Sequence, residues 1–175
     1  MPKLAQRRFG WPPSVEWIEA RLPKVIDDPS LMTKCHNLLA LVRAGAMGRP
    51  VLCHGDVGFH NMAFEPGTLD ITGLFDFDDA CANQPEWDLR YLTFDPKDHN
   101  HDILSRGLDA YERAGGDTPS LKRTLVFNAL SAISYLAFRE NVSPLTRWCG
   151  RTLEEDLAWT RLAIANAHDA VDQTQ

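Results

Sequence analysis

Residues 51–64 read VLCHGDVGFHNMAF, a polar loop enclosed by two apolar runs. The two apolar runs predict short strands, and the glycine-containing segment 54–60 predicts an irregular loop between them. Asp56 falls in this loop, and Asn61 lies at the entry to the second strand. The stretch therefore predicts a small β-structure that places a carboxylate and a side-chain amide at one end.

The following residues extend this β-structure and add further carboxylates. EPGT at 65–68 carries the proline and glycine of a turn, and 69–75 predicts a third strand. LFDFDDA at 74–80 places Asp76 directly after that strand, and QPEWDL at 84–89 follows closely. Acidic side chains beside apolar residues are less typical of a plain solvated surface than of a site.

These residue types suit phosphoryl transfer. That reaction needs an acceptor hydroxyl held in line and a divalent metal that neutralises the phosphates. Mg²⁺ prefers oxygen ligands, often one or two carboxylates with phosphate and water, which Asp56, Asn61 and Asp76 can supply. Protein kinases use the order H-R-D-x-x-x-x-N followed by D-F-G. In this chain Gly55 stands in place of the arginine, and DFD at 76–78 stands in place of D-F-G.

As a set, H-G-D-x-x-x-x-N, F-D-F-D-D-A and P-E-W-D-L between residues 54 and 89 resemble the aminoglycoside phosphotransferase family. These are small-molecule kinases with a protein-kinase-like fold. The resemblance implies a protein-kinase-like C-terminal lobe in which a small β insert carries the catalytic loop. It also implies ATP or another nucleoside triphosphate as the phosphoryl donor, Mg²⁺ as the metal and a small-molecule alcohol as the acceptor.

The same resemblance implies a role for each matching residue. Asp56 is expected to be the catalytic base that orients and deprotonates the acceptor hydroxyl. Asn61 and Asp76 are expected to hold the metal that bridges the nucleotide phosphates. His54, grouped with these two as cofactor-binding, is expected to pack the loop against the strand that ends in Asp76. Asp79 is expected to support the metal, with structural hydrogen bonding in the loop as the alternative.

The rest of the chain predicts helices on both sides of the β insert. Apolar periodicity indicates helices at 14–22, 28–47, 85–94, 100–114, 119–140 and 145–171. The segment 121–138 is apolar on most sides, which predicts a buried central helix. Asp88 lies near a helix start, where the resemblance implies that it accepts hydrogen bonds from the catalytic-loop backbone.

The predicted fold class is α+β and mostly helical. The 175 residues suit one domain, 1–175, with leading helices (1–49), a strand-and-loop insert (50–84) and a helical body (85–175). The N-terminal lobe that covers the nucleotide in the family is expected to be absent, because no G-x-G-x-x-G occurs and Lys3, Lys24 and Lys34 fall outside the predicted strands. The chain is then a truncated product, a lobe completed by a second chain, or a remnant with a non-kinase role.

Three functions fit these residues. The first is an ATP- and Mg²⁺-dependent phosphotransferase acting on a small-molecule hydroxyl. The alternative is a non-catalytic kinase-like lobe that serves as a binding or interaction module. A third is hydrolysis with two metals gathered by Asp56, Asp76, Asp78 and Asp79, which the lack of a histidine ligand set disfavours.

Composition excludes other classes. The net charge is −6, and residues 54–102 hold 11 acidic and two basic residues, so no nucleic-acid partner is expected. No apolar run approaches the roughly 20 residues of a membrane span, and no apolar segment follows the N-terminal positive charges as in a signal peptide. Four scattered cysteines predict free thiols and a cytoplasmic protein. The acidic residues at 154–156 are interpreted as the solvated start of the last helix.

Overall fold

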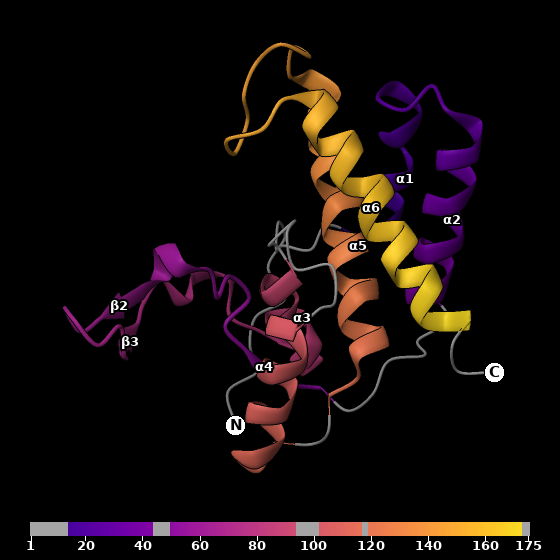
Figure 1. Ribbon diagram of the computed structural model, residues 1–175. Helices are drawn as coiled ribbons and strands as arrows, with labels where there is room; N and C mark the ends of the chain where they lie inside the picture. Colours follow the sequence, from indigo (N-terminus) through magenta and orange to yellow (C-terminus); the bar gives the residue numbers. More distant parts are fainter. Residues whose placement is uncertain (1–13, 44–49, 94–101, 117–118, 173–175) are drawn as a thin grey trace. The chain divides into compact units, whose positions relative to one another are not determined.

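The structure is a computed structural model that describes residues 14–43, 50–93, 102–116 and 119–172 (Figure 1). The described residues fall into two compact units. The first unit comprises those between 50 and 119, and the second comprises 14–43 together with 120–172. Helices dominate and the strands form small antiparallel sheets, so the predicted mostly helical α+β class is confirmed.

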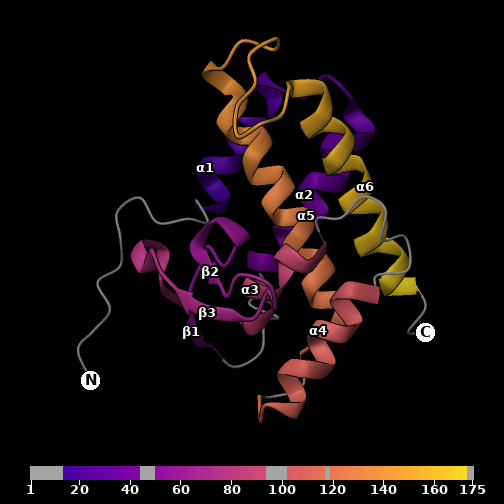
Figure 2. The same ribbon diagram turned by 60° about the vertical axis from the view of Figure 1, so that its left-hand side comes forward.

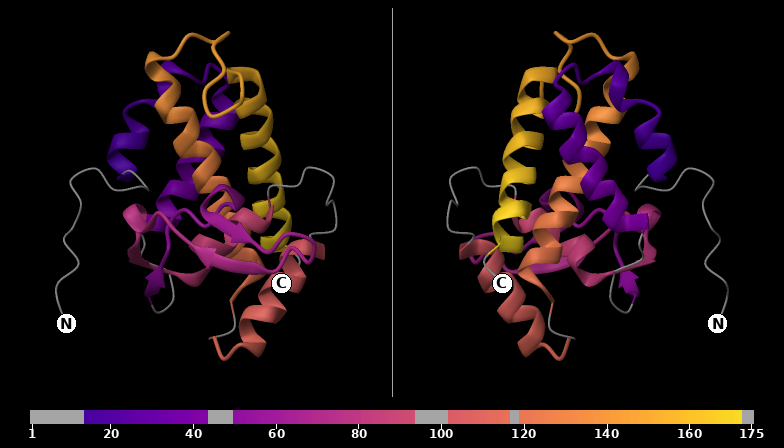
Figure 3. Two further views of the ribbon diagram at one scale, coloured as in Figure 1. Left: turned by 90° about the vertical axis from the view of Figure 1, so that its left-hand side faces the viewer. Right: turned by 90° about the vertical axis from the view of Figure 1, so that its right-hand side faces the viewer.

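The second unit is entirely helical apart from its loops (Figure 2). Its elements are α1 (Val15–Glu19), η1 (Leu22–Lys24), α2 (Pro29–Arg43), α5 (Leu121–Phe138), η5 (Arg139–Asn141) and α6 (Leu153–Asp172). Helix α5 contacts α1, α2 and α6, as the two views of Figure 3 show. Most of its side chains are buried, which confirms the prediction of a buried central helix.

The predicted starts of the first two helices are confirmed by the hydrogen bonds of their capping residues. The Ser14 hydroxyl accepts a hydrogen bond from the Trp17 N–H at 3.2 Å and caps α1. The Asp28 carboxylate accepts from the Ser30 and Leu31 N–H groups at the start of α2. Helix α1 is shorter than predicted, because the chain turns into η1, which contains Pro23.

Two details of the second unit differ from the sequence predictions. Helix α6 starts at Leu153 rather than near 145, because the preceding loop is held by Arg139, which donates to the Thr146 carbonyl oxygen at 2.8 Å. The apolar periodicity of α2 and α6 predicts that Leu41 and Leu162 are buried, whereas these leucines are 46% and 50% exposed. The predicted end of α2 near residue 47 lies outside the described residues.

The acidic start of α6 is only partly solvated. Glu154 and Glu155 are exposed, as predicted. Asp156 is fully buried, and its carboxylate forms ion pairs with Arg139 at 2.7 Å and with Arg151 at 2.5 Å. The interpretation of Asp156 as a solvated residue is therefore wrong, because two guanidinium groups turn it inward.

The first unit consists of two small antiparallel sheets and short helices. Strand β1 (Val51–Cys53) pairs with β4 (Cys81–Asn83), and β2 (Met62–Phe64) pairs with β3 (Ile71–Leu74). The helical elements are η2 (Phe59–Asn61), η3 (Phe77–Asp79), α3 (Pro85–Leu89), η4 (Arg90–Thr93) and α4 (Asp102–Arg113). The expected helix at 85–94 is thus divided into α3 and a 3₁₀ turn.

Strand β4 was not predicted, although it shapes the site. Its register with β1 sets Cys53 opposite Cys81 and Val51 opposite Asn83. This pairing connects the strand before the loop at residues 54–60 to the chain that follows the Asp76 turn. All four cysteines are free thiols, as predicted. Within the described ranges, no helix combines the length and apolar character needed to cross a membrane.

Candidate active site

The loop at residues 54–60, which contains Asp56, is fixed at its start by the carboxylate of Asp88 in α3. The Asp88 oxygens accept hydrogen bonds from the backbone N–H groups of His54 and Gly55 at 2.8 and 2.9 Å. Two charge-assisted bonds to adjacent N–H groups define both the position and the direction of this segment. The hydrogen bonds predicted for Asp88 are therefore confirmed, and its side chain is half-buried.

Gly55 lets the loop lie directly against the turn that contains Asp79. The φ angle of Gly55 is +90°, in a region that side-chain-bearing residues rarely adopt. A Cβ atom on Gly55 would lie 2.2 Å from the Asp79 carbonyl oxygen. Glycine at this position is therefore required by both conformation and space, which gives a physical reason for its presence where protein kinases carry arginine.

His54 connects the loop to the end of strand β3. Its Nδ1 accepts a hydrogen bond from the Asp56 N–H at 3.3 Å, so Nε2 carries the proton and donates to the Phe75 carbonyl oxygen at 2.9 Å. The imidazole is buried and lies 4.5 Å from the Phe77 ring, centroid to centroid. These contacts are those expected of a residue that packs the loop against the strand ending in Asp76.

The Asp56 carboxylate is held on both oxygens by neighbouring side chains. The Tyr91 hydroxyl donates to Oδ1. Oδ2 is 3.1 Å from His60 Nε2 and also accepts from Asn61 Nδ2 at 3.1 Å. Asn61 Nδ2 donates in addition to the Asp56 backbone oxygen at 2.8 Å. Asp56 and Asn61, five residues apart in sequence, are thus brought into direct contact.

The charge state of Asp56 follows from these contacts. Partial burial by itself raises the pKa of the carboxyl, but the hydrogen bonds from Tyr91 and His60 and the positive charge of Arg90 outweigh it. The net effect lowers the pKa of Asp56 below its ordinary value of 3.8. The carboxylate is therefore ionised at neutral pH and is ready to accept a hydrogen bond from a hydroxyl group.

Arg90 lies beneath this loop and is 2% exposed. Its guanidinium donates to the carbonyl oxygens of Gly55, at 3.1 Å, and of Trp87. It also stacks on the Trp87 ring, with Cζ 3.5 Å from the ring centroid. The loop is therefore held from its N–H side by Asp88 and from its carbonyl side by Arg90.

Asn61 and Asp76 lie at the same end of the β2–β3 hairpin. The Phe75 N–H donates to the Asn61 carbonyl oxygen at 3.1 Å, so the residue before Asp76 is paired with Asn61. Asp76 has φ +61° and ψ +63°, a left-handed conformation that is strained for a non-glycine residue. Its side chain is exposed. The register of the hairpin thus brings together the two residues predicted to bind the metal.

The donor set fits a hard divalent cation. Asn61 turns its amide nitrogen toward Asp56, which directs Oδ1 away from that carboxylate, and Asp76 adds a carboxylate. Oxygen donors in this number suit Mg²⁺, which keeps several waters or phosphate oxygens among its ligands. Asp79 is half-buried and approaches Gly55 through its backbone, which favours a structural role. Among the described residues, no three His, Cys, Asp or Glu side chains gather around a metal-sized site.

Sequence reasoning missed the side chains that complete the site. Tyr91 and Arg90 follow the P-E-W-D-L motif directly, but nothing in their spacing indicates contact with a loop 35 residues earlier. His60 has the exposed side chain that is typical of a loop residue, yet its ring reaches Asp56. The sequence separation of four between Asp56 and His60 is the one local signal that pointed to such a contact.

Comparison with known proteins adds a family assignment. Residues 3–123 match the model of a family described as the Phosphotransferase enzyme family (APH). The match covers all three motifs and the elements that position them, from β1 to α4. Among curated proteins, none matches the chain.

Proposed function

The chain belongs to the phosphotransferase enzyme family, and on this premise we propose that it is a kinase of a small-molecule alcohol. The phosphoryl donor is ATP or another nucleoside triphosphate. One observation carries the proposal: an ionised carboxylate, Asp56, is oriented on both oxygens, in a loop fixed by two hydrogen bonds to Asp88. Phosphoryl transfer depends mainly on holding the acceptor hydroxyl in line with the phosphate, and a fixed, oriented carboxylate serves that purpose.

In the proposed reaction, Asp56 accepts a hydrogen bond from the acceptor hydroxyl and aligns its oxygen with the terminal phosphorus. The alcohol oxygen forms a bond to that phosphorus, and the bond from phosphorus to the bridging oxygen of the nucleotide breaks. The hydroxyl proton passes to the Asp56 carboxylate. Because the pKa of Asp56 is low, we expect the proton to move late, so the main role of Asp56 is orientation.

Asn61 and Asp76 are the residues proposed to hold Mg²⁺ through their side-chain oxygens. When bound, the cation supplies neutralisation of the negative charge on the phosphate oxygens. His54, Gly55 and Asp79 have a supporting role, because they join the loop to the turn that carries Asp76. We further propose that the first unit corresponds to part of a protein-kinase-like C-terminal lobe. The chain order of its elements supports this: the loop with Asp56 comes first, followed by the hairpin, the Asp76 turn and α3.

The test is phosphoryl transfer from radiolabelled ATP with Mg²⁺ to a panel of alcohols, for the full chain and its Asp56→Asn variant. We expect the variant to lose about 10²–10⁴-fold in turnover, the range for a group that transfers a proton. Asp109→Asn, at an exposed position of α4, is the matched control and should keep full activity. Equal turnover in the wild-type protein and the Asp56→Asn variant would overturn the role of Asp56.

A second candidate function is a binding or interaction module, and exposed apolar side chains favour it. Large apolar residues of the hairpin region are exposed, including Phe59 (78%), Leu69 (74%) and Ile71 (59%). A two-stranded hairpin is marginally stable by itself, and exposed apolar patches mark interaction surfaces. The proposed partner is a second chain that covers the hairpin and completes a nucleotide site.

Calorimetry separates the two functions. Titration of the full chain with ATP and Mg²⁺ should release or absorb heat and raise the melting temperature if the protein is a kinase by itself. The absence of heat and of thermal stabilisation at millimolar ligand would favour the interaction module. Sedimentation analysis with Ile71→Lys as a variant then tests whether the hairpin carries the contact with a second chain.

A further inference from the structure

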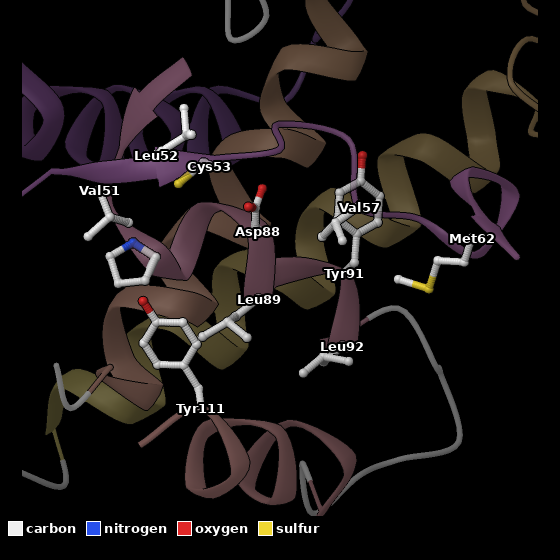
Figure 4. A pocket seen from close by; sticks show the side chains of 11 residues that line it. Val51, Leu52, Cys53, Val57, Met62, Asp88, Leu89, Tyr91, Leu92 and Tyr111 are labelled. Carbon is white, nitrogen blue, oxygen red and sulfur yellow. The ribbon is translucent and has the colours of Figure 1, made fainter. Parts of the chain in front are cut away.

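A cavity of about 260 Å³ lies in the first unit beside the catalytic loop (Figure 4). Its wall is formed by β1, the loop after Asp56, the start of β2, α3, η4 and α4. Apart from Asp88 and two tyrosines, the lining side chains are apolar or carry sulfur. Small-molecule sites are typically concave, mostly apolar and furnished with a few polar groups, and this cavity has that composition.

The cavity adjoins Asp56 through two residues. Val57, the next residue after Asp56, lines it, and so does the ring of Tyr91, whose hydroxyl donates to Asp56 Oδ1. In Figure 4 the Tyr91 hydroxyl and the Asp88 carboxylate point to the same side, whereas Leu89 and Leu92 lie on the other. One side of the cavity is therefore next to the catalytic loop, and the other side is aliphatic.

Two of the three polar side chains in the wall, Asp88 and Tyr91, already form hydrogen bonds within the protein. Among the described residues that line the cavity, Asp88 is the only one with an acidic or basic side chain. Its oxygens accept the His54 and Gly55 N–H groups, and the Tyr91 hydroxyl is bonded to Asp56. A charged ligand group would lose its hydration here and meet only one charged group, the Asp88 carboxylate, which is unfavourable for an anion and for a ligand with several cationic groups. The wall therefore selects ligands by their shape and by apolar contacts.

We propose that this cavity is the acceptor subsite and that it binds the compact, uncharged hydrocarbon part of an alcohol whose hydroxyl reaches Asp56. The assignment rests on the proposed kinase function. Transfer then yields the phosphate monoester of that alcohol and the nucleoside diphosphate, with the hydroxyl proton accepted by Asp56. Polycationic amino sugars are excluded as acceptors at this subsite, because the wall offers their several ammonium groups a single carboxylate, Asp88, whose oxygens already accept two backbone N–H groups.

The binding test uses the full chain with ¹³C-methyl-labelled methionine, because Met62 lines the cavity. Cyclohexylmethanol is the neutral probe and kanamycin is the polycationic one. The alcohol should shift the Met62 methyl resonance saturably, and kanamycin should leave it unchanged. No saturable shift with the alcohol, or a saturable shift with kanamycin, would overturn the assignment.

Variants connect the shift to the cavity itself. Leu92→Trp fills the cavity and should weaken cyclohexylmethanol binding by about tenfold, through lost apolar contact. Leu145→Trp, at a residue 91% exposed and remote in sequence from the cavity residues, should bind the alcohol like the wild-type protein. Because Leu92→Trp can fail to fold, Leu92→Ala is the second variant: it enlarges the cavity and should favour 1-adamantylmethanol over cyclohexylmethanol. Unchanged affinities in both Leu92 variants would contradict the proposal.

The cavity assignment and the kinase function fail in different ways. If cyclohexylmethanol binds as described but neither it nor any other alcohol, amino sugars included, is phosphorylated in the presence of ATP and Mg²⁺, the kinase function is wrong and the cavity still binds neutral hydrocarbon. If amino sugars are phosphorylated with dependence on Asp56 while neutral alcohols are not, the kinase function holds and the acceptor assignment is wrong.

Discussion

Replacing Gly55 by alanine tests the close approach between the catalytic loop and the Asp79 turn. Gly55 has φ +90°, and the added Cβ would meet the Asp79 carbonyl oxygen at 2.2 Å and its carbonyl carbon at 2.8 Å. Both atoms belong to the backbone, so no side-chain rotation relieves the overlap. One of the two segments has to move, and with it the N–H group of Gly55 that donates to Asp88.

The expected magnitude has two parts. A positive φ costs a residue other than glycine about 1–2 kcal/mol. Overpacking against a fixed neighbour adds about 1–3 kcal/mol. We therefore expect Gly55→Ala to lower the free energy of unfolding by about 2–5 kcal/mol. Because the displaced loop carries Asp56, turnover should fall as well.

Gly67→Ala is the matched control. Gly67 has φ +100°, but an added Cβ would meet nothing within 4 Å, so this variant carries the conformational strain without the overlap. Urea unfolding of both variants isolates the contact as the difference between them, which should be about 1–3 kcal/mol. Equal losses of stability, or full turnover in Gly55→Ala, would refute the reasoning that Gly55 is required by its contact with Asp79.

Three further changes probe other parts of the structure. Asp88→Asn places an amide against two N–H donors and should lower the free energy of unfolding by about 1–3 kcal/mol. Asp109→Asn, at an exposed position of α4, should leave the free energy of unfolding unchanged. Equal effects of the two substitutions would contradict the anchoring role of Asp88. Asp156→Asn leaves the buried Arg139 guanidinium without its counter-ion and should cost about 3–5 kcal/mol in urea unfolding, with Glu154→Gln as the exposed control in the same helical turn. Since the pKa of Asp56 is lowered, its ionised form stabilises the folded protein above the ordinary pKa of 3.8, and this contribution is lost as the pH falls through the lower folded-state value. The free energy of unfolding should therefore fall less on acidification in Asp56→Asn than in the wild-type protein. Parallel curves of this free energy against pH for the two proteins would show that the folded state does not stabilise the carboxylate.

Much of the site was predictable because its first elements are local. A carboxylate in a loop, an amide five residues later and a carboxylate at a strand end are read directly from residues 54–76. The β2–β3 hairpin also follows from local signals, since its turn at 65–68 contains Pro66 and Gly67. The two strand ends of such a hairpin meet, so the turn between two apolar runs also predicts that Asn61 lies close to the residue before Asp76.

Other features of the site depend on contacts between distant segments. Tyr91 and Arg90 act on Asp56 and Gly55 only because α3 and η4 are folded under the loop. Strand β4 is three residues long, and its identity as a strand depends on pairing with β1 rather than on its own composition. Local propensity cannot predict such elements, because the partner strand supplies the hydrogen bonds that stabilise them.

The sequence alone determined the family resemblance, the mostly helical α+β class and the choice of Asp56, Asn61 and Asp76 as candidate site residues. The tertiary structure decided which neighbours hold these residues and lower the pKa of Asp56, and it decided where local rules mislead. Asp156 lies in an acidic helix start that local rules read as solvated, yet it is buried between two arginines. The physical reason is that burial and ion pairing depend on which segments meet in space, which residue spacing along one helix does not specify.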